Sequence, residues 1–428
     1  MSERLLVAVI LVKINDQICL PNAARLLHSD PFLMTRFYFD HNATTPIHEE
    51  VAQVMADTLR TSFGNASSIH REGQRARQIL ETARRAVAAH LCCGAGEIVF
   101  TSGGTESNNL AIRGLVRPGE KSVHVITCAI EHPAVLEVCR ALEQTGVNVS
   151  YVPVSRSGVV DPQLVQREIR PETRLVSIMH ANNEVGTIQP LADVACVIRE
   201  LRKRGQIIFL HSDGVQIFGK ISVNVAELGV DLYSLSAHKV NGPKGVGALY
   251  VRKGVPLRSI QFGGRHERER RPGTENVAGA AAFAKALELA AQDNLGGKLG
   301  ELRDRFERQV CAALEDIRIN GSEGERLPNT SNIYFAGVEG EAVVIALDLK
   351  GFAVSSGSAC SSGSVEPSHV LLAMGYSRQD ARRSVRFSLG RGNTEESVDA
   401  LAEAVIASVR QLRGAHGRNE RQPAYVNV

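Results

Sequence analysis

Short apolar runs that end in polar residues alternate along most of this chain with longer stretches of helical spacing. Apolar positions recur every three or four residues at 48–63, 72–92 and 191–205, which predicts amphipathic helices. Apolar runs typical of buried strands lie in the following stretches: 97–116, 122–135, 173–186, 206–216 and 230–239. Strands that alternate with helices indicate an α/β protein whose central sheet is mostly parallel.

The pattern changes near residue 276, where a smaller α+β domain is expected to follow the large one. Long helices are predicted at 275–292 and 298–315, short strands at 331–336 and 384–389, and a last helix at 395–413. The predicted division is a large α/β domain over 48–275, a small α+β domain formed by 36–47 together with 276–414, and a loose tail over 415–428.

The first 35 residues stand apart from this pattern. The stretch "RLLVAVILVK" is too short to span a bilayer, and no convincing cleavage site follows it, so neither a membrane anchor nor a signal peptide is favoured. The organised pattern begins just after Met34. We therefore expect either a disordered extension over 1–35 or a translation start at Met34.

Composition narrows the class of partner. The chain has 428 residues, of which 43% are hydrophobic and 22% charged, and its net charge is +3. That charge is too small to indicate nucleic acid as the main partner. The cysteines form no C-x-x-C pair, so no zinc or other metal site is predicted, and a disulfide framework is not expected at this length. A reduced, cytoplasmic location is the default expectation.

Lys239 is the first candidate for chemistry. It follows the apolar stretch "VDLYSLSAHK" and precedes "VNGPKG", with Ser236 and His238 beside it. Most lysines are solvated surface residues, but a lysine held in a cleft at a strand end can form a Schiff base with an aldehyde cofactor. This points to pyridoxal 5′-phosphate (PLP).

PLP makes demands that other parts of the sequence can be tested against. Its phosphate needs backbone N–H groups at a helix N-terminus, and "TSGGTESNN" offers a glycine turn leading into a helix. Its ring nitrogen needs a carboxylate, for which Asp213 follows a strand; a helix-capping role for this residue is the alternative. Its ring needs a flat partner, for which His132 is a candidate, although a lone histidine at a strand end is more often structural.

Cys360 raises a separate question. It lies within "SSGSACSSGS", a run of serine and glycine that cannot contribute to a core. A thiol in such a loop indicates chemistry, because free cysteine is otherwise usually a buried small hydrophobe.

Taken together, these motifs resemble the cysteine desulfurases of the NifS/IscS type, which are PLP enzymes of fold type I in the class V aminotransferase group. The resemblance runs over residues 36 to 412 and is carried by the following motifs: "YFDHNATTP", "TSGGTESNNLAI", "EHPAV", "MHANNEVGTIQP", "SAHKVNGPKGVGALYVR", "RPGTENVAG", "SSGSACSSGSVEPSHVLLAMG" and "RFSLGRGNTEE". It implies a large PLP-binding domain with a mostly parallel sheet and a smaller α+β domain that carries a mobile loop with the catalytic cysteine.

The resemblance also implies roles for individual residues. Lys239 would hold the cofactor and move the α-proton, Cys360 would be the nucleophile, and His132 would stack on the cofactor ring. Asn183 and Gln216 would approach the cofactor's O3′, Asn183 would also meet the substrate, and Arg386 would bind the substrate carboxylate. The phosphate would be held by Gly104, Thr105, Ser236, His238 and, from the other subunit of a homodimer with shared active sites, Thr274.

The implied reaction converts L-cysteine to L-alanine and leaves the sulfur on Cys360 as a persulfide, which would pass to an iron–sulfur scaffold or another acceptor protein. Arg265 departs from the family pattern, in which a glycine is usual. An altered dimer edge or substrate entry is one interpretation, and a solvated basic loop is the favoured one. A selenocysteine lyase is the nearest alternative. An aminotransferase or β-lyase, and a silent homologue that acts only as a binding partner, are the others.

Overall fold

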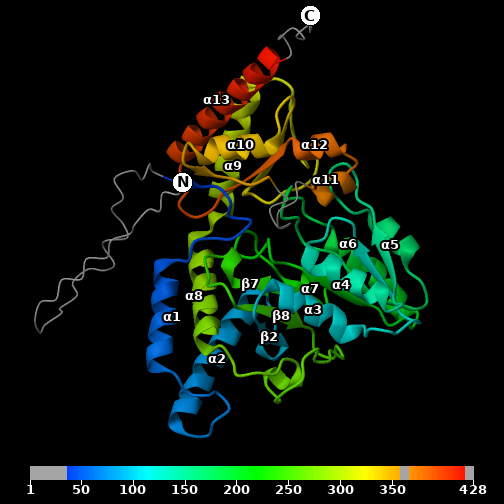
Figure 1. The fold of residues 1–428 in the computed structure, drawn as a ribbon. Coiled ribbons are helices and arrows are strands. Elements are labelled where there is room, and N and C mark those ends of the chain that lie inside the picture. The colour runs from blue at the N-terminus through cyan, green and yellow to red at the C-terminus, as the bar shows by residue number, and fades with distance from the viewer. Residues whose placement is uncertain (1–35, 357–365, 420–428) are drawn as a thin grey trace, which may run out of the picture. The chain divides into compact units, whose positions relative to one another are not determined.

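The computed structural model describes residues 36–356 and 366–419. The largest feature is a seven-stranded sheet (Figure 1). Its strands are, in order across the sheet, β2 (Ile98–Thr101), β8 (Gly247–Val251), β7 (Leu232–Ser236), β6 (Phe209–Asp213), β5 (Thr173–Ser177), β3 (His124–Cys128) and β4 (Asn148–Val152).

The sheet is mostly parallel, as the sequence pattern predicts. Strands β4, β3, β5, β6 and β7 pair in parallel, and β8 pairs antiparallel with both β7 and β2. Because β2 and β7 both oppose β8, they run in the same direction. The carboxyl ends of all the strands except β8 therefore reach the same edge of the sheet, which is where open α/β sheets bind ligands.

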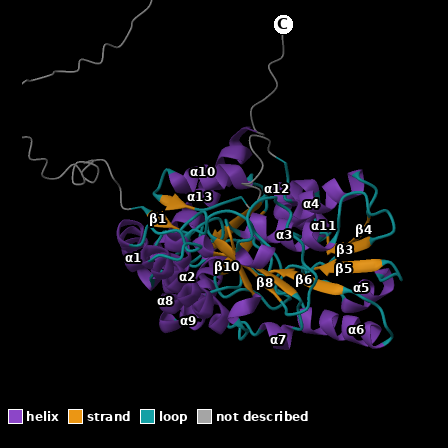
Figure 2. Ribbon diagram, turned by 90° about the horizontal axis from the view of Figure 1, so that it is seen from below, coloured by secondary structure: helices purple, strands orange, loops and turns teal. Residues whose placement is uncertain are grey.

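Helices cover both faces of this sheet (Figure 2). They are α1 (Glu49–Thr61), α2 (Arg71–His90), α3 (Gly104–Leu115), α4 (Pro133–Gln144), α5 (Pro162–Glu168), α6 (Leu191–Lys203), α7 (Val225–Leu228) and α8 (Val277–Asp293), with short 3-10 turns η1 (Ala95–Glu97), η2 (Ala237–Lys239) and η3 (Glu267–Glu269). Successive strand residues face opposite sides, so Val125 packs with α3 and α4 whereas Ile126 packs in the core that contains α2, α6 and α8.

A second, antiparallel sheet has its own hydrophobic core. It consists of β9 (Ile317–Ile319), β10 (Thr330–Phe335) and β12 (Ser384–Ser388). Its core includes Phe306, Phe335 and Phe387, and the residues around it come from α9 (Leu295–Ala313), α10 (Gly340–Asp348) and α13 (Glu395–Asn419), which gather at the top of Figure 1. The remaining elements are β1 (Phe37–Tyr38), which pairs in parallel with β11 (Phe352–Ala353), and the short helices α11 (His369–Ala373) and α12 (Arg378–Arg382).

Two details differ from the sequence prediction. Helix α13 extends to Asn419, so residues 415–419 of the predicted loose tail are helical. Helix α8, which the predicted division assigned to the small domain, packs on α1 and α2, and its Phe283 lies in the core beneath the large sheet. The residues from Phe37 onward form one compact unit, and the division into two domains stays a prediction.

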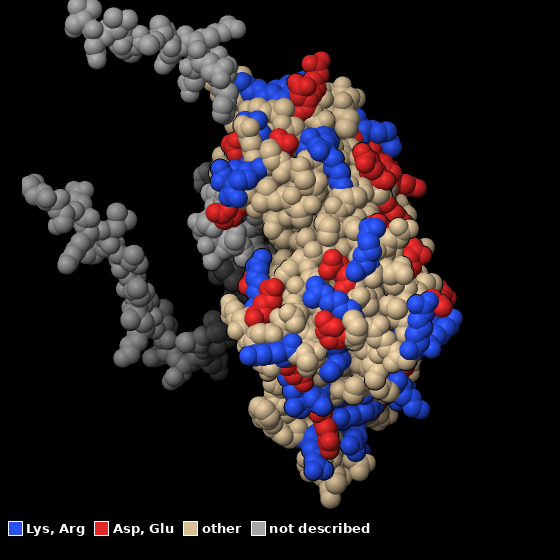
Figure 3. Space-filling model, turned by 90° about the vertical axis from the view of Figure 1, so that its right-hand side faces the viewer, with Lys and Arg blue, Asp and Glu red and all other residues tan. Residues whose placement is uncertain are grey.

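The surface carries both charge signs. Lysine and arginine are interspersed with aspartate and glutamate over the face in Figure 3, in keeping with the small net charge. Across the described part of the chain, every helix is too short or too polar to cross a bilayer.

Candidate active site

Polar side chains gather at the edge of the large sheet where its parallel strands end. Asp213 is the last residue of β6, Ser236 is the last residue of β7, and Lys239 closes the 3-10 turn η2 that follows β7. His132 precedes α4, shortly after β3. The sheet thus brings together residues that are more than 100 positions apart in the sequence.

Lys239 points its amine at the loop that follows β1. Its Nζ donates to the carbonyl oxygens of Asn42, at 2.5 Å, and Ala43, at 2.6 Å. The loop is joined to η2 by further bonds, because the Thr45 N–H and hydroxyl both donate to the His238 carbonyl, at 3.0 and 2.8 Å. The same contacts therefore position both the lysine and the loop that it reaches.

Asp213 is a buried carboxylate held from two sides. Its Oδ2 accepts from Asn108 Nδ2 on α3 at 2.7 Å, and its Oδ1 accepts from the Val215 N–H at 3.0 Å. The second bond closes a turn rather than starting a helix, so the helix-capping alternative is wrong. The Oδ1 of Asn108 is buried and has no hydrogen-bond partner among the described residues.

The glycine turn before α3 forms a cradle in which side chains are disfavoured, by the backbone conformation at Gly103 and by a close contact at Gly104. Gly103 has φ +150°, a conformation that L residues rarely adopt, and a Cβ on Gly104 would lie 2.8 Å from Val215 Cγ2. Beside them, a Cβ on Gly247 would lie 2.7 Å from Gly103 Cα. The first turn of α3 presents backbone N–H groups here, and a helix N-terminus favours an anion.

The side chains predicted to complete a phosphate site lie beside this cradle or near Lys239. The Oγ of Ser236 would be 3.7 Å from a Cβ on Gly103. Thr105 lies in the first turn of α3 and is exposed. His238 Nδ1 is bonded to Thr44 Oγ1 at 3.1 Å, and burial, followed by Lys239 and Lys244, lowers its pKa to about 4.

The chemistry of this donor set fits PLP. A backbone cradle with no Cβ atoms suits a phosphate, and the buried carboxylate Asp213 suits a protonated ring nitrogen. The amine of Lys239 suits an aldehyde.

His132 has a structural role as well as a place in the site. Its Nδ1 accepts from the Ala134 N–H at 3.0 Å and thereby caps α4. Because a backbone N–H can only donate, neutral His132 carries its proton on Nε2. Burial lowers its pKa and Lys239 and His369 lower it further, while Asp213 opposes them, so the ring is neutral near pH 7.

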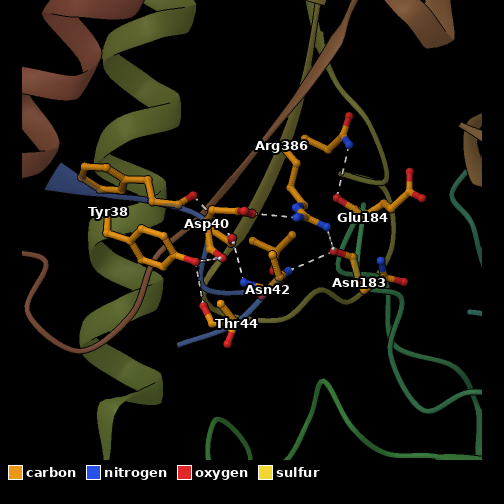
Figure 4. Close-up of polar contacts among 12 residues, drawn as sticks. Tyr38, Asp40, Asn42, Thr44, Asn183, Glu184 and Arg386 are labelled. Atoms are coloured by element: carbon orange, nitrogen blue, oxygen red, sulfur yellow. Dashed lines mark hydrogen bonds and ion pairs between the residues drawn. The ribbon is translucent and has the colours of Figure 1, made fainter. Parts of the chain in front are cut away.

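Arg386 is a buried residue of β12, and its guanidinium is the centre of a polar network (Figure 4). Its Nη2 donates to Asp40 Oδ1 at 2.7 Å, and its Nη1 donates to the Asn183 carbonyl at 3.1 Å. Asn42 Nδ2 donates to the same carbonyl at 3.1 Å. The Nε of Arg386 is buried without a partner in the part of the chain that the structure describes.

Two predicted site residues are not brought into these contacts. Cys360 lies outside the described residues. Thr274 is exposed, in the segment between η3 and α8, and the bonds above do not include it.

The described residues on either side of the Cys360 segment are attached beside the guanidinium. Ser355 and Arg386 exchange backbone hydrogen bonds of 3.2 and 2.7 Å. Ser368 donates to the carboxylate of Glu184, next to Asn183. The described residues Ser355 and Ser368 are thus bonded to Arg386 and to Glu184, the neighbour of Asn183.

Asn42, which is hydrogen-bonded to several of the candidate site residues, and its neighbour Lys220 were not identified from the sequence. Gln216 Nε2 donates to the Asn42 carbonyl at 2.9 Å, and Lys220 Nζ donates to Asn42 Oδ1 at 3.2 Å. The motif "YFDHNATTP" marked the segment that holds Asn42 without assigning it a role. Among the described residues, no group of three or more His, Cys, Asp or Glu is placed to hold a metal ion.

Comparison with known proteins adds the family context. The family model described as aminotransferase class-V matches residues 37–401. The chain is 47% identical over 379 residues to cysteine desulfurase IscS of Dictyoglomus turgidum, covering 88% of this chain and 95% of the relative. Among solved structures, a NifS-like protein matches at 38% identity with a TM-score of 0.81, covering 88% of this chain and 100% of the other. A structure of SspA in complex with cysteine matches at 37% identity with a TM-score of 0.73, covering 83% and 99%.

Proposed function

The chain belongs to the class-V aminotransferase family and, within it, to the cysteine desulfurases of the IscS and NifS type, and on that premise we propose that it converts L-cysteine to L-alanine and receives the sulfur on Cys360 as a persulfide. The observation that carries the proposal is the attachment of Ser355 to Arg386: the segment with the thiol begins beside the group suited to an amino-acid carboxylate.

The cofactor of this family is PLP, and the residues described above fit it. Asp213 would pair with the ring nitrogen, and His132 would lie on the ring. Gln216 and Asn183 would meet the O3′ oxygen. The phosphate would be held by Gly104, Thr105, Ser236 and His238 with the amides at the start of α3. When bound, PLP supplies an electron sink that stabilises negative charge on the substrate's α-carbon.

The protein's own groups would then orient the substrate and move its protons. Arg386 would bind the substrate carboxylate through its guanidinium fork, whose buried Nε has no other partner among the described residues. Lys239 Nζ would take the proton from the α-carbon and later return one. Neutral His132 carries a proton on Nε2 and would assist these transfers.

Sulfur transfer requires Cys360 to act as a thiolate, and the overall reaction balances in atoms and electrons. The Cys360 thiolate would attack the substrate sulfur, so that a sulfur–sulfur bond forms as the carbon–sulfur bond breaks. The electron pair of the broken bond remains on the substrate's β-carbon, which takes up a proton to become the methyl group of alanine. L-cysteine and one thiol thus give L-alanine and one persulfide, with no external oxidant or reductant.

Mass spectrometry after mixing the protein with L-cysteine tests this directly. We expect one added sulfur on the peptide that contains Cys360, together with released alanine. Cys360→Ala should abolish both, and an exposed-cysteine control, Cys196→Ala, should abolish neither. Persistent alanine formation from cysteine in Cys360→Ala would refute the nucleophile. Turnover of selenocysteine but not cysteine by the wild type would favour a selenocysteine lyase.

We also propose a cytoplasmic homodimer in which Thr274 reaches the phosphate of the other subunit. The exposure of Thr274 supports this. Mixing Lys239→Ala with Thr274→Ala should restore activity above that of either variant, because one site of each mixed dimer then carries neither substitution. If Thr274 served its own subunit, mixing would restore nothing. An acceptor protein, such as an iron–sulfur scaffold, would take the sulfur, and transfer of labelled sulfur from Cys360 tests each candidate.

A further inference from the structure

Lys220 is a second amine in the proposed cofactor site. It lies in the turn after β6, and it lines the same cavity as Lys239. The residue is half-buried, and its Nζ reaches inward to two buried side chains. It donates to Gln216 Oε1 at 3.1 Å and to Asn42 Oδ1 at 3.2 Å.

These bonds determine which way the Gln216 amide faces. When Lys220 is protonated its ammonium can only donate, so the atom of Gln216 that faces it is then the oxygen. On the other side, the Asn42 carbonyl can only accept, so the atom that faces it must be the nitrogen, which donates at 2.9 Å. Two independent partners thus demand the same orientation of one amide.

Asn42 is oriented by the same logic. Its Oδ1 faces the Lys220 ammonium, and its Nδ2 faces the Asn183 carbonyl, which can only accept. The backbone carbonyl of Asn42 also accepts from Lys239 Nζ. A single ammonium therefore fixes both a side chain expected at the cofactor and the residue that receives the cofactor-binding lysine.

The position of Lys220 is electrostatically unfavourable. Burial, followed by the charges of Lys239 and Arg386, lowers the pKa of Lys220 to about 7. Both hydrogen bonds described above go to neutral amide oxygens, which do not offset those charges. Groups held in such surroundings are concentrated at functional sites.

We propose that Lys220 is a positioning residue of the cofactor site, which holds Gln216 with its NH₂ group available to an acceptor oxygen of the cofactor. The inference rests on the proposed function, since Gln216 meets such an oxygen only if this site binds PLP. Of the two hydrogens on Gln216 Nε2, one is used by the Asn42 carbonyl and the other remains for the cofactor. Without Lys220, the side-chain oxygen of Gln216 loses the hydrogen-bond donor that keeps it turned away from the cofactor.

Cofactor binding to the apoprotein separates positioning from a general structural effect. The dissociation constant for PLP is measured by titration, together with the absorbance maximum of the bound cofactor and the melting temperature. Lys220→Met should weaken PLP binding about tenfold, the effect of one charge-assisted hydrogen bond, and should shift the absorbance maximum. Lys298→Met, which removes an exposed lysine, should change neither.

A double-mutant cycle with Gln216→Leu gives the decisive comparison. If Lys220 acts through Gln216, Lys220→Met should add little to the loss in Gln216→Leu. Wild-type affinity in Lys220→Met, or losses that multiply in the double variant, would overturn the inference. Should Lys220→Met fail to fold, a crystal structure of the wild-type cofactor complex decides: Gln216 Oε1 must remain within hydrogen-bond distance of Lys220 Nζ. A wild type that binds no PLP would instead refute the proposed function itself.

Discussion

The Arg386 guanidinium donates to Asp40 Oδ1 at 2.7 Å, so the group proposed to bind the substrate carboxylate already has a carboxylate partner within the protein. That partner fixes the plane of the guanidinium and leaves its buried Nε to face elsewhere. An arginine held in this way is preorganised for bidentate binding, which a lysine cannot reproduce.

Arg386→Lys should therefore raise the KM for L-cysteine by about 10- to 100-fold, the usual cost of losing a hydrogen bond to a charged group. PLP binding should change little, because Arg386 is not among the residues expected to hold the cofactor. Steady-state kinetics measures the KM for L-cysteine, and PLP titration measures cofactor binding. The exposed Arg378→Lys serves as the control, and an unchanged KM in Arg386→Lys would contradict the assignment.

Asp213→Asn should retain the cofactor but lose turnover by at least about 100-fold. The change removes the negative charge that stabilises a protonated ring nitrogen, and the electron sink weakens with it. Asn108 on α3 would still have an oxygen to donate to, so the local hydrogen bond can survive. The absorbance spectrum and kcat are the measurements, with the exposed Asp193→Asn as the matched control. Near-normal kcat would refute the role.

Arg84 and Glu267 form a buried ion pair that should dominate local stability. Arg84 donates to the two carboxylate oxygens of Glu267 at 2.6 and 2.7 Å, and to the Ile98 carbonyl at 2.8 Å. Glu267 and the two residues that follow have positive φ angles of 44°, 57° and 65°, a strained turn that the pair fastens to α2 and β2.

Arg84→Met should lower the free energy of unfolding by about 3–5 kcal/mol, because it leaves a carboxylate buried and unpaired. Its neighbour Arg85 is exposed, so Arg85→Met should cost less than about 1 kcal/mol. Urea unfolding at fixed protein concentration compares the two. Equal losses in both variants would show that the buried pair is not the cause.

Acid sensitivity should come from buried neutral histidines. His211 is bonded to the hydroxyls of Ser177 and Ser234, and burial lowers its pKa to about 3. Its unfolded pKa is about 6.5, so below that pH the unfolded chain takes up a proton that the folded chain refuses. Stability is therefore full above about pH 6.5 and declines as the pH falls toward 3.

His211→Gln should reduce the slope of unfolding free energy against pH between about 6 and 4 by nearly one proton, or about 1.4 kcal/mol per pH unit. The slope is the readout, since the substitution also changes packing. His124 and His180, with pKa values lowered to about 4, contribute to the slope in both proteins, so the difference between the two slopes reports His211. Identical slopes would contradict the mechanism.

The individual strands and helices of the large sheet were predictable from the sequence, because each is encoded by a short continuous stretch of residues. The apolar runs that end at Asp213 and Ser236, and the helical spacing at 191–205, each encode one element without reference to distant residues. The reversed direction of strand β8 in the sheet was not predictable, since nothing in its local sequence shows it.

The candidate site was predictable only where chemistry or family resemblance marks a residue. Asp213 ends β6 and Lys239 lies just after β7, and the direction of the strands brings them together. Asn42 carries no such mark: its partners lie 141 residues away at Asn183 and 288 residues away at Thr330, so its position emerges only in three dimensions. Lys220 also carries no mark in the sequence, because a lysine in a turn is normally solvated.

The attachment of Ser355 to β12 and of Ser368 to Glu184 has a practical consequence for engineering. Both attachments lie outside the stretch 357–365, so substitutions confined to that stretch leave the two anchoring contacts unchanged. Variants that keep Cys360 but differ elsewhere in this stretch can therefore be screened for sulfur delivery to new recipients, with Arg386 and Glu184 unaltered.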